Sequence, residues 1–186
     1  MTVAELYANW LAPLDGSARE DMLRAMRRVD VALGERVARA DPSDPAGFRA
    51  SLVAEGVRRV REAVALHGEG GRLADDDVAW LAILCQLLGD VRDVAWALAV
   101  EMPEPSAALW LDVLRRAGGD GVRVPACLFA VAAALRGERA QALLALEHAL
   151  RAHPGDEEAV RLDRLLREDV PPGELRRLLS EARARG

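Results

Sequence analysis

Apolar residues recur along this chain with the spacing of α-helices rather than that of β-strands. Between about residues 17 and 40, apolar positions three and four residues apart are separated by arginine and acidic residues, the pattern of a helix with one buried face. Asp15 or Ser17 can cap its start, and Ser17 and Glu20 have the spacing of a capping box. The predicted buried face consists of Leu23, Met26, Val29, Leu33 and Val37.

A second long helix is predicted from Pro45 to about His67. Asp44 can cap its first turn, and proline suits the first helical position because the N–H that it lacks would have no partner there. On the surface of this helix, the spacing predicts ion pairs of Glu55 with both Arg58 and Arg59, and of Arg58 with Glu62.

Glycine and proline divide the rest of the chain into shorter helical segments with short connections. The other predicted helices cover residues 2–12, 75–88, 91–102, 105–117, 125–136, 138–153, 156–168 and 174–184. The fold class is therefore all-α, an irregular array of about ten helices in a single domain over residues 1–186. Possible sub-units are residues 1–70, 73–172 and 173–186.

The best-formed part of this predicted array is residues 125–154, an antiparallel helical hairpin that turns at Gly137. Small residues at Ala142 and Ala149, a large apolar residue at Leu146 and the proline at Pro154 have the spacing of a tetratricopeptide-like unit. The small side chains let the two helices approach closely. A looser version of the pattern covers residues 78–103, so we expect tetratricopeptide-like hairpins rather than a regular repeat array.

Composition supports the helical interpretation and narrows the chemistry. Isoleucine and threonine occur once each, so strand-forming residues are scarce. The chain contains no lysine and therefore no Schiff-base or phosphate-binding lysine. A net charge of −5 argues against a general nucleic-acid binder. The longest apolar run, residues 126–135, is too short for a bilayer, and the N-terminus does not have the pattern of a signal peptide, so we expect a cytoplasmic protein without a membrane contact.

Several segments in order along the chain resemble an actinobacterial family catalogued as domain of unknown function 4192, in its C-terminal helical part. They are Leu73-Ala-Asp-Asp-Asp-Val-Ala79, Val91-Arg-Asp-Val-Ala-Trp96, Leu109-Trp-Leu-Asp-Val-Leu-Arg-Arg-Ala117, Leu135-Arg-Gly-Glu-Arg-Ala140 and the run from Ala145 to Pro154. The resemblance implies a high-GC bacterial source and supplies no established activity. Because family members usually also carry an N-terminal α/β portion, the chain is expected to be either a stand-alone version or a piece of a longer protein.

No motif with the spacing of a catalytic, metal or cofactor site stands out. Asp75, Asp76 and Asp77 are better explained as acids that complement the positive end of a helix than as metal ligands. His148 and His153 point in different directions on a helix, which does not favour zinc. Cys85 and Cys127 lie in apolar runs, where thiols are usually inert. We therefore expect no metal, no cofactor and no catalytic residues, and we favour a protein that is not an enzyme.

The candidate binding residues are tryptophans and arginines, which dominate the energetics of protein interfaces. They are Trp80, Arg92, Trp96, Trp110, Arg115 and Arg116. The competing interpretation, which we favour for the tryptophans, is that they fill the core. For the arginines, it is that they form structural ion pairs, such as those of Asp112 with Arg115 and Arg116.

Three functional hypotheses follow. The first is a helical scaffold without catalytic activity that binds a protein partner or a second copy of itself. The second is a small-ligand or enzymatic domain with a pocket near Trp80, Trp96 and Trp110. The third is a nucleic-acid-associated regulator that uses Arg24, Arg27 and Arg28 or the arginine-rich last helix.

Overall fold

The chain is helical throughout the residues that the computed structural model describes, which are 10–12, 14–168 and 170–184. Its helices are α2 (Gly16–Arg39), α3 (Pro45–Gly68), α4 (Asp75–Leu87), α5 (Gly89–Glu101), α6 (Pro103–Ala117), the 3-10 helix η1 (Gly119–Val122), α7 (Arg123–Leu135), α8 (Arg139–Ala152), α9 (Glu157–Arg167) and α10 (Pro172–Ala184). The prediction of an all-α array of about ten helices is confirmed. The predicted helix over residues 2–12 lies almost wholly outside the described residues.

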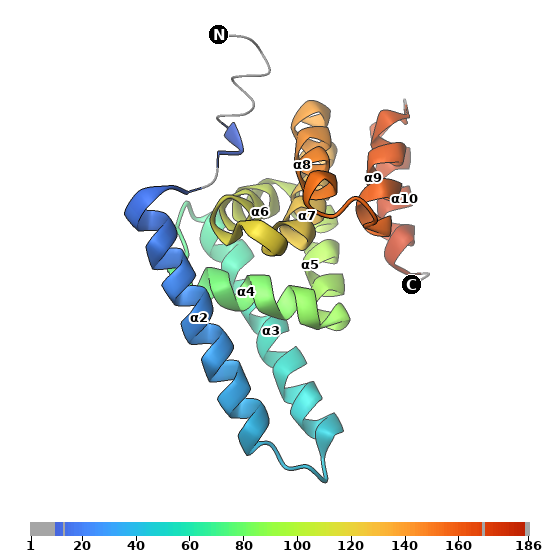
Figure 1. The fold of residues 1–186 in the computed structure, drawn as a ribbon. Helices are drawn as coiled ribbons and strands as arrows, with labels where there is room; N and C mark the ends of the chain where they lie inside the picture. The colour runs from blue at the N-terminus through green and yellow to red at the C-terminus, as the bar shows by residue number, and fades with distance from the viewer. Residues whose placement is uncertain (1–9, 13, 169, 185–186) are drawn as a thin grey trace.

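Helix α7 occupies the centre of the molecule (Figure 1). Every residue from Val124 to Ala134 is buried, because α5, α6, α8 and α9 all pack against this helix. A helix that is apolar on all its faces must be enclosed in this way to remove its side chains from water. The apolar run that was too short for a bilayer is therefore the central helix of the core.

Helices α7 and α8 form the hairpin that the sequence predicts for residues 125–154. Gly137 turns the chain with a φ of +81°, a conformation that glycine adopts without steric cost. The N–H of Glu138 donates to the carbonyl oxygen of Ala133 over 2.9 Å, which closes the end of α7 in a Schellman-type turn. The alanines of α8 at positions 142, 145 and 149 are completely buried, as close packing of two helices requires.

Helices α2 and α3 form an arm that extends from the rest of the molecule and turns at residues 40–44 (Figure 1). We call residues 16–68 the α2–α3 arm. Helix α4 packs against both of its helices, and α3 also packs against α5 and α6. Gly56 brings α3 close to α5, because a Cβ atom at this position would lie 2.6 Å from Cγ2 of Val91.

The start of α3 agrees with the sequence, and the start of α2 does not. The Asp44 side chain accepts a hydrogen bond from the N–H of Gly47 over 2.8 Å, and Pro45 is the first residue of α3. By contrast, α2 begins at Gly16. Asp15, one of the two predicted caps, occupies the N-cap position, but its side chain makes no hydrogen bond to the helix. The predicted capping box of Ser17 and Glu20 therefore does not start this helix.

The buried face of α2 also differs from the predicted one. The buried residues are Met22, Ala25, Val29 and Leu33, whereas Leu23 and Val37 are 47% and 56% exposed. Consecutive helical residues are about 100° apart around the axis. The predicted face contains Leu23 instead of Met22, so it is rotated away from the side of α2 that packs against α4. None of the described helices has the length and apolar character needed to cross a membrane.

Candidate functional site

Two of the three candidate tryptophans lie in the core. Trp110 has no exposed surface, and Trp96 is 3% exposed. The indole N–H of Trp96 donates to the carbonyl oxygen of Leu179 over 2.8 Å, which links α5 to α10. Trp110 therefore offers no surface to a partner and Trp96 very little, and both positions agree with the core-filling interpretation of these residues.

Trp80 is partly buried and lies at the junction of the α2–α3 arm with α4. The guanidinium groups of Arg36 and Arg59 lie 5.7 Å and 5.1 Å from the centre of its ring. Both distances are within the range of a cation–π interaction. Trp80 therefore contacts one arginine from each helix of the arm.

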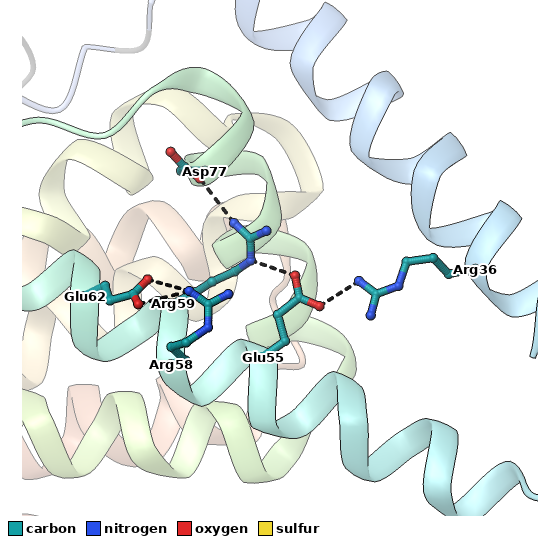
Figure 2. A network of polar contacts seen from close by, with 6 residues as sticks. All are labelled: Arg36, Glu55, Arg58, Arg59, Glu62 and Asp77. Carbon is teal, nitrogen blue, oxygen red and sulfur yellow. Dashed lines mark hydrogen bonds and ion pairs between the residues drawn. The ribbon is translucent and has the colours of Figure 1, made fainter.

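A carboxylate connects the same two arginines (Figure 2). Arg36 donates to Oε2 of Glu55 over 2.7 Å, and Arg59 donates to Oε1 over 2.9 Å. Arg59 also pairs with Asp77 over 3.2 Å. We call Arg36, Glu55, Arg59 and Asp77 the Glu55 network. It joins α2, α3 and α4 in one set of ion pairs.

The charges around Glu55 stabilise its ionised form. Burial by itself raises the pKa of Glu55, but the hydrogen bonds and positive charges of Arg36 and Arg59 together outweigh it, so the pKa lies below its usual range. The predicted pairs of Glu55 with Arg59 and of Arg58 with Glu62 are both present. The predicted partner Arg58 binds Glu62 rather than Glu55, and the other oxygen of Glu55 binds Arg36.

Arg116 belongs to a buried ionic cluster at the end of α6. Its side chain is 3% exposed and pairs with Asp112 over 2.8 Å and with Asp75 from α4. It also donates to the carbonyl oxygen of Leu73 over 2.9 Å. The predicted Asp112–Arg116 ion pair is thus structural. The Asp75 carboxylate is likewise paired with Arg116, which agrees with a structural role for Asp75 rather than with metal binding.

The remaining candidate arginines lie apart from each other. Arg115 donates through Nε to the carbonyl oxygen of Trp10 over 2.7 Å. Arg92 lines a cavity of about 540 Å³ between α5, α9 and α10, together with Trp96. The six candidate residues therefore do not form one surface: Arg92 and Trp96 share one cavity, and Arg115 and Arg116 line another.

The cavity beside Arg115 and Arg116 is an apolar groove of about 490 Å³ between α2 and the end of α6. We call it the α2–α6 groove. Its floor consists of Leu14, Met22, Leu23, Met26, Leu114 and Val122. Arg19 from α2 and His148 from α8 also line it, and Gly118 and Gly119 form one edge. The groove therefore combines the exposed Leu23, which the sequence had placed in the core, with two of the candidate arginines.

Comparison with protein families assigns the chain to one of them. The family model named Domain of unknown function (DUF4192) matches residues 3–173. The chain belongs to the DUF4192 family. No curated protein and no solved structure matches it. The family assignment thus agrees with the resemblance that the sequence motifs carry, and it brings no described activity with it.

Burial shifts the protonation of one thiol and one imidazole in this DUF4192 protein. Burial raises the pKa of the Cys85 thiol to about 12, with Arg92 opposing the shift, so the thiol is protonated at neutral pH. Burial also lowers the pKa of His148, assisted by the charge of Arg151. Among the described residues, no three His, Cys, Asp or Glu side chains are grouped closely enough to hold a metal ion.

Sequence analysis missed the α2–α6 groove because its parts come from distant segments. The floor joins the stretch before α2, the first turns of α2, the end of α6 and η1. One local signal was available: Met22, Leu23 and Met26 place more apolar surface on α2 than a single narrow face needs. These extra apolar residues indicate a second apolar surface on α2, but they do not show which other segments lie beside it.

Proposed function

We propose that this chain is a helical scaffold that binds a protein partner through the α2–α6 groove. The observation that carries the proposal is the apolar lining of the groove, in which Leu23 remains 47% exposed beside the partly buried Met26 and Leu14. Exposed apolar surface in a concave site is typical of binding sites. A methionine side chain such as that of Met26 can adapt its shape to a partner, which suits such a role.

The nucleic-acid hypothesis receives less support from the same helix. Arg24 pairs with Asp21 over 2.6 Å and Arg28 pairs with Asp76 over 2.5 Å, so acids already compensate two of the three arginines proposed for phosphate contacts. Arginines that contact phosphates must exchange such partners for the nucleic-acid backbone. This exchange reduces the gain in affinity that Arg24 and Arg28 offer.

A photo-crosslinking amino acid at Leu23 tests the proposal in the source cells. Val160 on α9 is the matched control position, because it is also apolar and 37% exposed and does not line the groove. We expect a specific protein adduct from position 23 and none of the same identity from position 160. The purified partner should then bind the chain, and Leu23→Asp should weaken binding while Val160→Asp leaves it unchanged. Equal effects of the two substitutions would rule out the groove as the binding site.

A further inference from the structure

We infer that the partner segment in the α2–α6 groove is an amphipathic helix with acidic residues beside its apolar face. This inference rests on the proposed function and specifies the chemistry of the partner. It depends on three properties of the groove, namely the arrangement of its floor, the sign of the charges around it and its open end at the glycine turn.

The floor has the shape and chemistry that accept one face of a helix. Leu23 and Met26 lie about one turn apart on α2 and keep apolar surface in the groove, and the partly buried Leu14 lines the same groove. The volume of about 490 Å³ accommodates roughly three apolar groups of benzene size, for which about 150 Å³ each is sufficient. A partner helix presents such groups at positions i, i+3 or i+4, and i+7.

The charged groups that line the groove are all basic among the residues that the structure describes. They are Arg19, Arg115 and Arg116, and no described carboxylate lines the groove, although the whole chain carries a net charge of −5. His148, whose pKa burial lowers, adds no negative charge to the lining. A partner with acidic residues therefore complements the groove, whereas a basic partner meets charges of its own sign.

Two of these arginines have donors available for such a partner. Arg19 is exposed and has no hydrogen bond or ion pair to another described side chain. Arg115 donates to Trp10 only through Nε, which leaves its terminal nitrogens available. Arginine can bind a carboxylate through two parallel hydrogen bonds, which favours aspartate and glutamate as the partner residues. Arg116 is paired with both Asp75 and Asp112, which compensate its charge, so the attraction for an acidic partner depends on Arg19 and Arg115.

The glycine turn leaves one end of the groove open. Gly118 and Gly119 have φ values of +58° and +52°, and a Cβ atom at either position would have no other atom within 4 Å. The backbone at this edge therefore has free space in front of it. A helix longer than the groove can continue past Gly118 and Gly119, which have no side chains of their own.

Two designed peptides test the inference directly. Both are amphipathic helices of about 18 residues with leucine at i, i+3, i+4 and i+7, and they differ only in carrying either glutamate or lysine beside the leucine face. We expect the glutamate peptide to bind the full chain at least about tenfold more tightly than the lysine peptide, measured by fluorescence anisotropy. Raising the salt from about 50 mM to about 300 mM should weaken its binding, because the rim charges are then screened.

A matched pair of arginine variants locates the charge effect. Arg19→Glu should weaken binding of the glutamate peptide about fivefold or more. Arg27→Glu changes the net charge equally on the same exposed helix but does not line the groove, so it should change the affinity less than about twofold. Equal effects of both variants would mean that overall charge, not the groove, controls binding, and would overturn the inference.

The remaining outcomes separate the inference from the proposed function. Equal affinity of the chain for the two peptides would overturn the acidic-helix assignment. A Leu23→Asp variant that binds the glutamate peptide as tightly as the unchanged protein would overturn it too. The assignment would also fail if analytical ultracentrifugation shows a dimer that Leu23→Asp dissociates, because the groove would then hold a second copy of the chain. Tight binding of dodecanoate without binding of the glutamate peptide would likewise overturn it. If position 23 crosslinks a partner and neither peptide binds, only this inference fails. If both experiments are negative, the proposed function fails with it.

Discussion

Helices α7 and α2 show two different ways of attaching a helix to the same molecule. In α7, which has 13 residues, the whole run from Val124 to Ala134 is buried. In α2, which has 24 residues, only Met22, Ala25, Val29 and Leu33 are buried. The sequence difference explains this, because α7 is apolar on every side, whereas α2 carries arginine and acidic residues between its apolar positions. We therefore expect α7 to determine global stability, whereas changes in α2 loosen one helix.

The outer half of α2 depends on polar contacts more than its inner half does. Beyond Leu33, its connection to α3 is the ion pair of Arg36 with Glu55, whose side chains are 32% and 19% exposed. The ion pair of Arg28 with Asp76 is more than half exposed on both sides, and exposed pairs contribute little. The Glu55 network is therefore the main contact that holds the outer part of α2 beside the rest of the arm.

The largest effect is expected from Phe129→Ala in α7. Phe129 is 1% exposed, and truncating a buried phenylalanine typically destabilises a protein by about 3–5 kcal/mol. Urea denaturation should show this loss as a shift of the whole transition. Leu23→Ala on the exposed face of α2 is the control, with an expected change within about 0.5 kcal/mol. A loss of similar size in both variants would contradict the distinction between the two helices.

Glycine-to-alanine changes test the same distinction on the arm. At Gly56 the new Cβ would lie 2.6 Å from Val91 Cγ2, so Gly56→Ala should destabilise the protein by about 1–3 kcal/mol. At Gly34 in α2 no atom lies within 4 Å of the new Cβ, so Gly34→Ala should stabilise it by about 0.5–1 kcal/mol. Both values come from urea denaturation. Opposite signs are the expected result, and a stabilising Gly56→Ala would show that α3 and α5 are not closely packed.

These examples also show which parts of the molecule the sequence can predict. The Asp44 cap, the turn at Gly137 and the apolar character of α7 are local signals, and each of them agrees with the structure. The buried row of α2 was predicted correctly at Val29 and Leu33 and wrongly at Leu23. Leu23 is as apolar as Met22, and only the position of α4 decides between them. Local spacing likewise identifies the pair of Glu55 with Arg59.

The features missed by the sequence depend on contacts between distant segments. Arg36 is 19 residues from Glu55, and nothing in its local pattern distinguishes it from the other arginines of α2. The α2–α6 groove depends in the same way on where the end of α6 meets the start of α2. For the candidate residues, composition identified Trp96 and Trp110, but only the packing shows that both rings face the core.

The next largest effect is expected from Glu55→Gln. The neutral amide leaves Arg36 and Arg59 beside Trp80 without the anion between them, which should destabilise the protein by about 1–2 kcal/mol. Hydrogen exchange should become faster in the outer half of α2, approximately residues 30–39, while α7 remains protected. Uniformly faster exchange in α7 as well would contradict the expectation that the Glu55 network holds only the arm.

The contribution of Glu55 should also disappear in acid. Because its pKa in the folded protein is lowered, ionised Glu55 stabilises the fold above its ordinary pKa, and this stabilisation is lost as the pH falls through the lowered value. The difference in unfolding free energy between the unchanged protein and Glu55→Gln should therefore be complete at about pH 7 and small at about pH 2–3. Urea denaturation of both proteins at these pH values checks the sign. A difference that grows in acid would contradict it.

The smallest effect is expected from Glu62→Gln, which serves as the matched change for Glu55→Gln on the same helix. Glu62 binds Arg58 over 2.8 Å, but both side chains are about 60% exposed, at 61% and 58%, and both belong to α3. Such a pair stabilises its own helix by only about 0.3–0.5 kcal/mol and joins no second element. Urea denaturation should show a loss within that range, and hydrogen exchange in α2 should stay unchanged. A loss as large as that of Glu55→Gln would mean that the number of ion pairs on α3, rather than the bridge from Glu55 to Arg36, sets the stability of the arm.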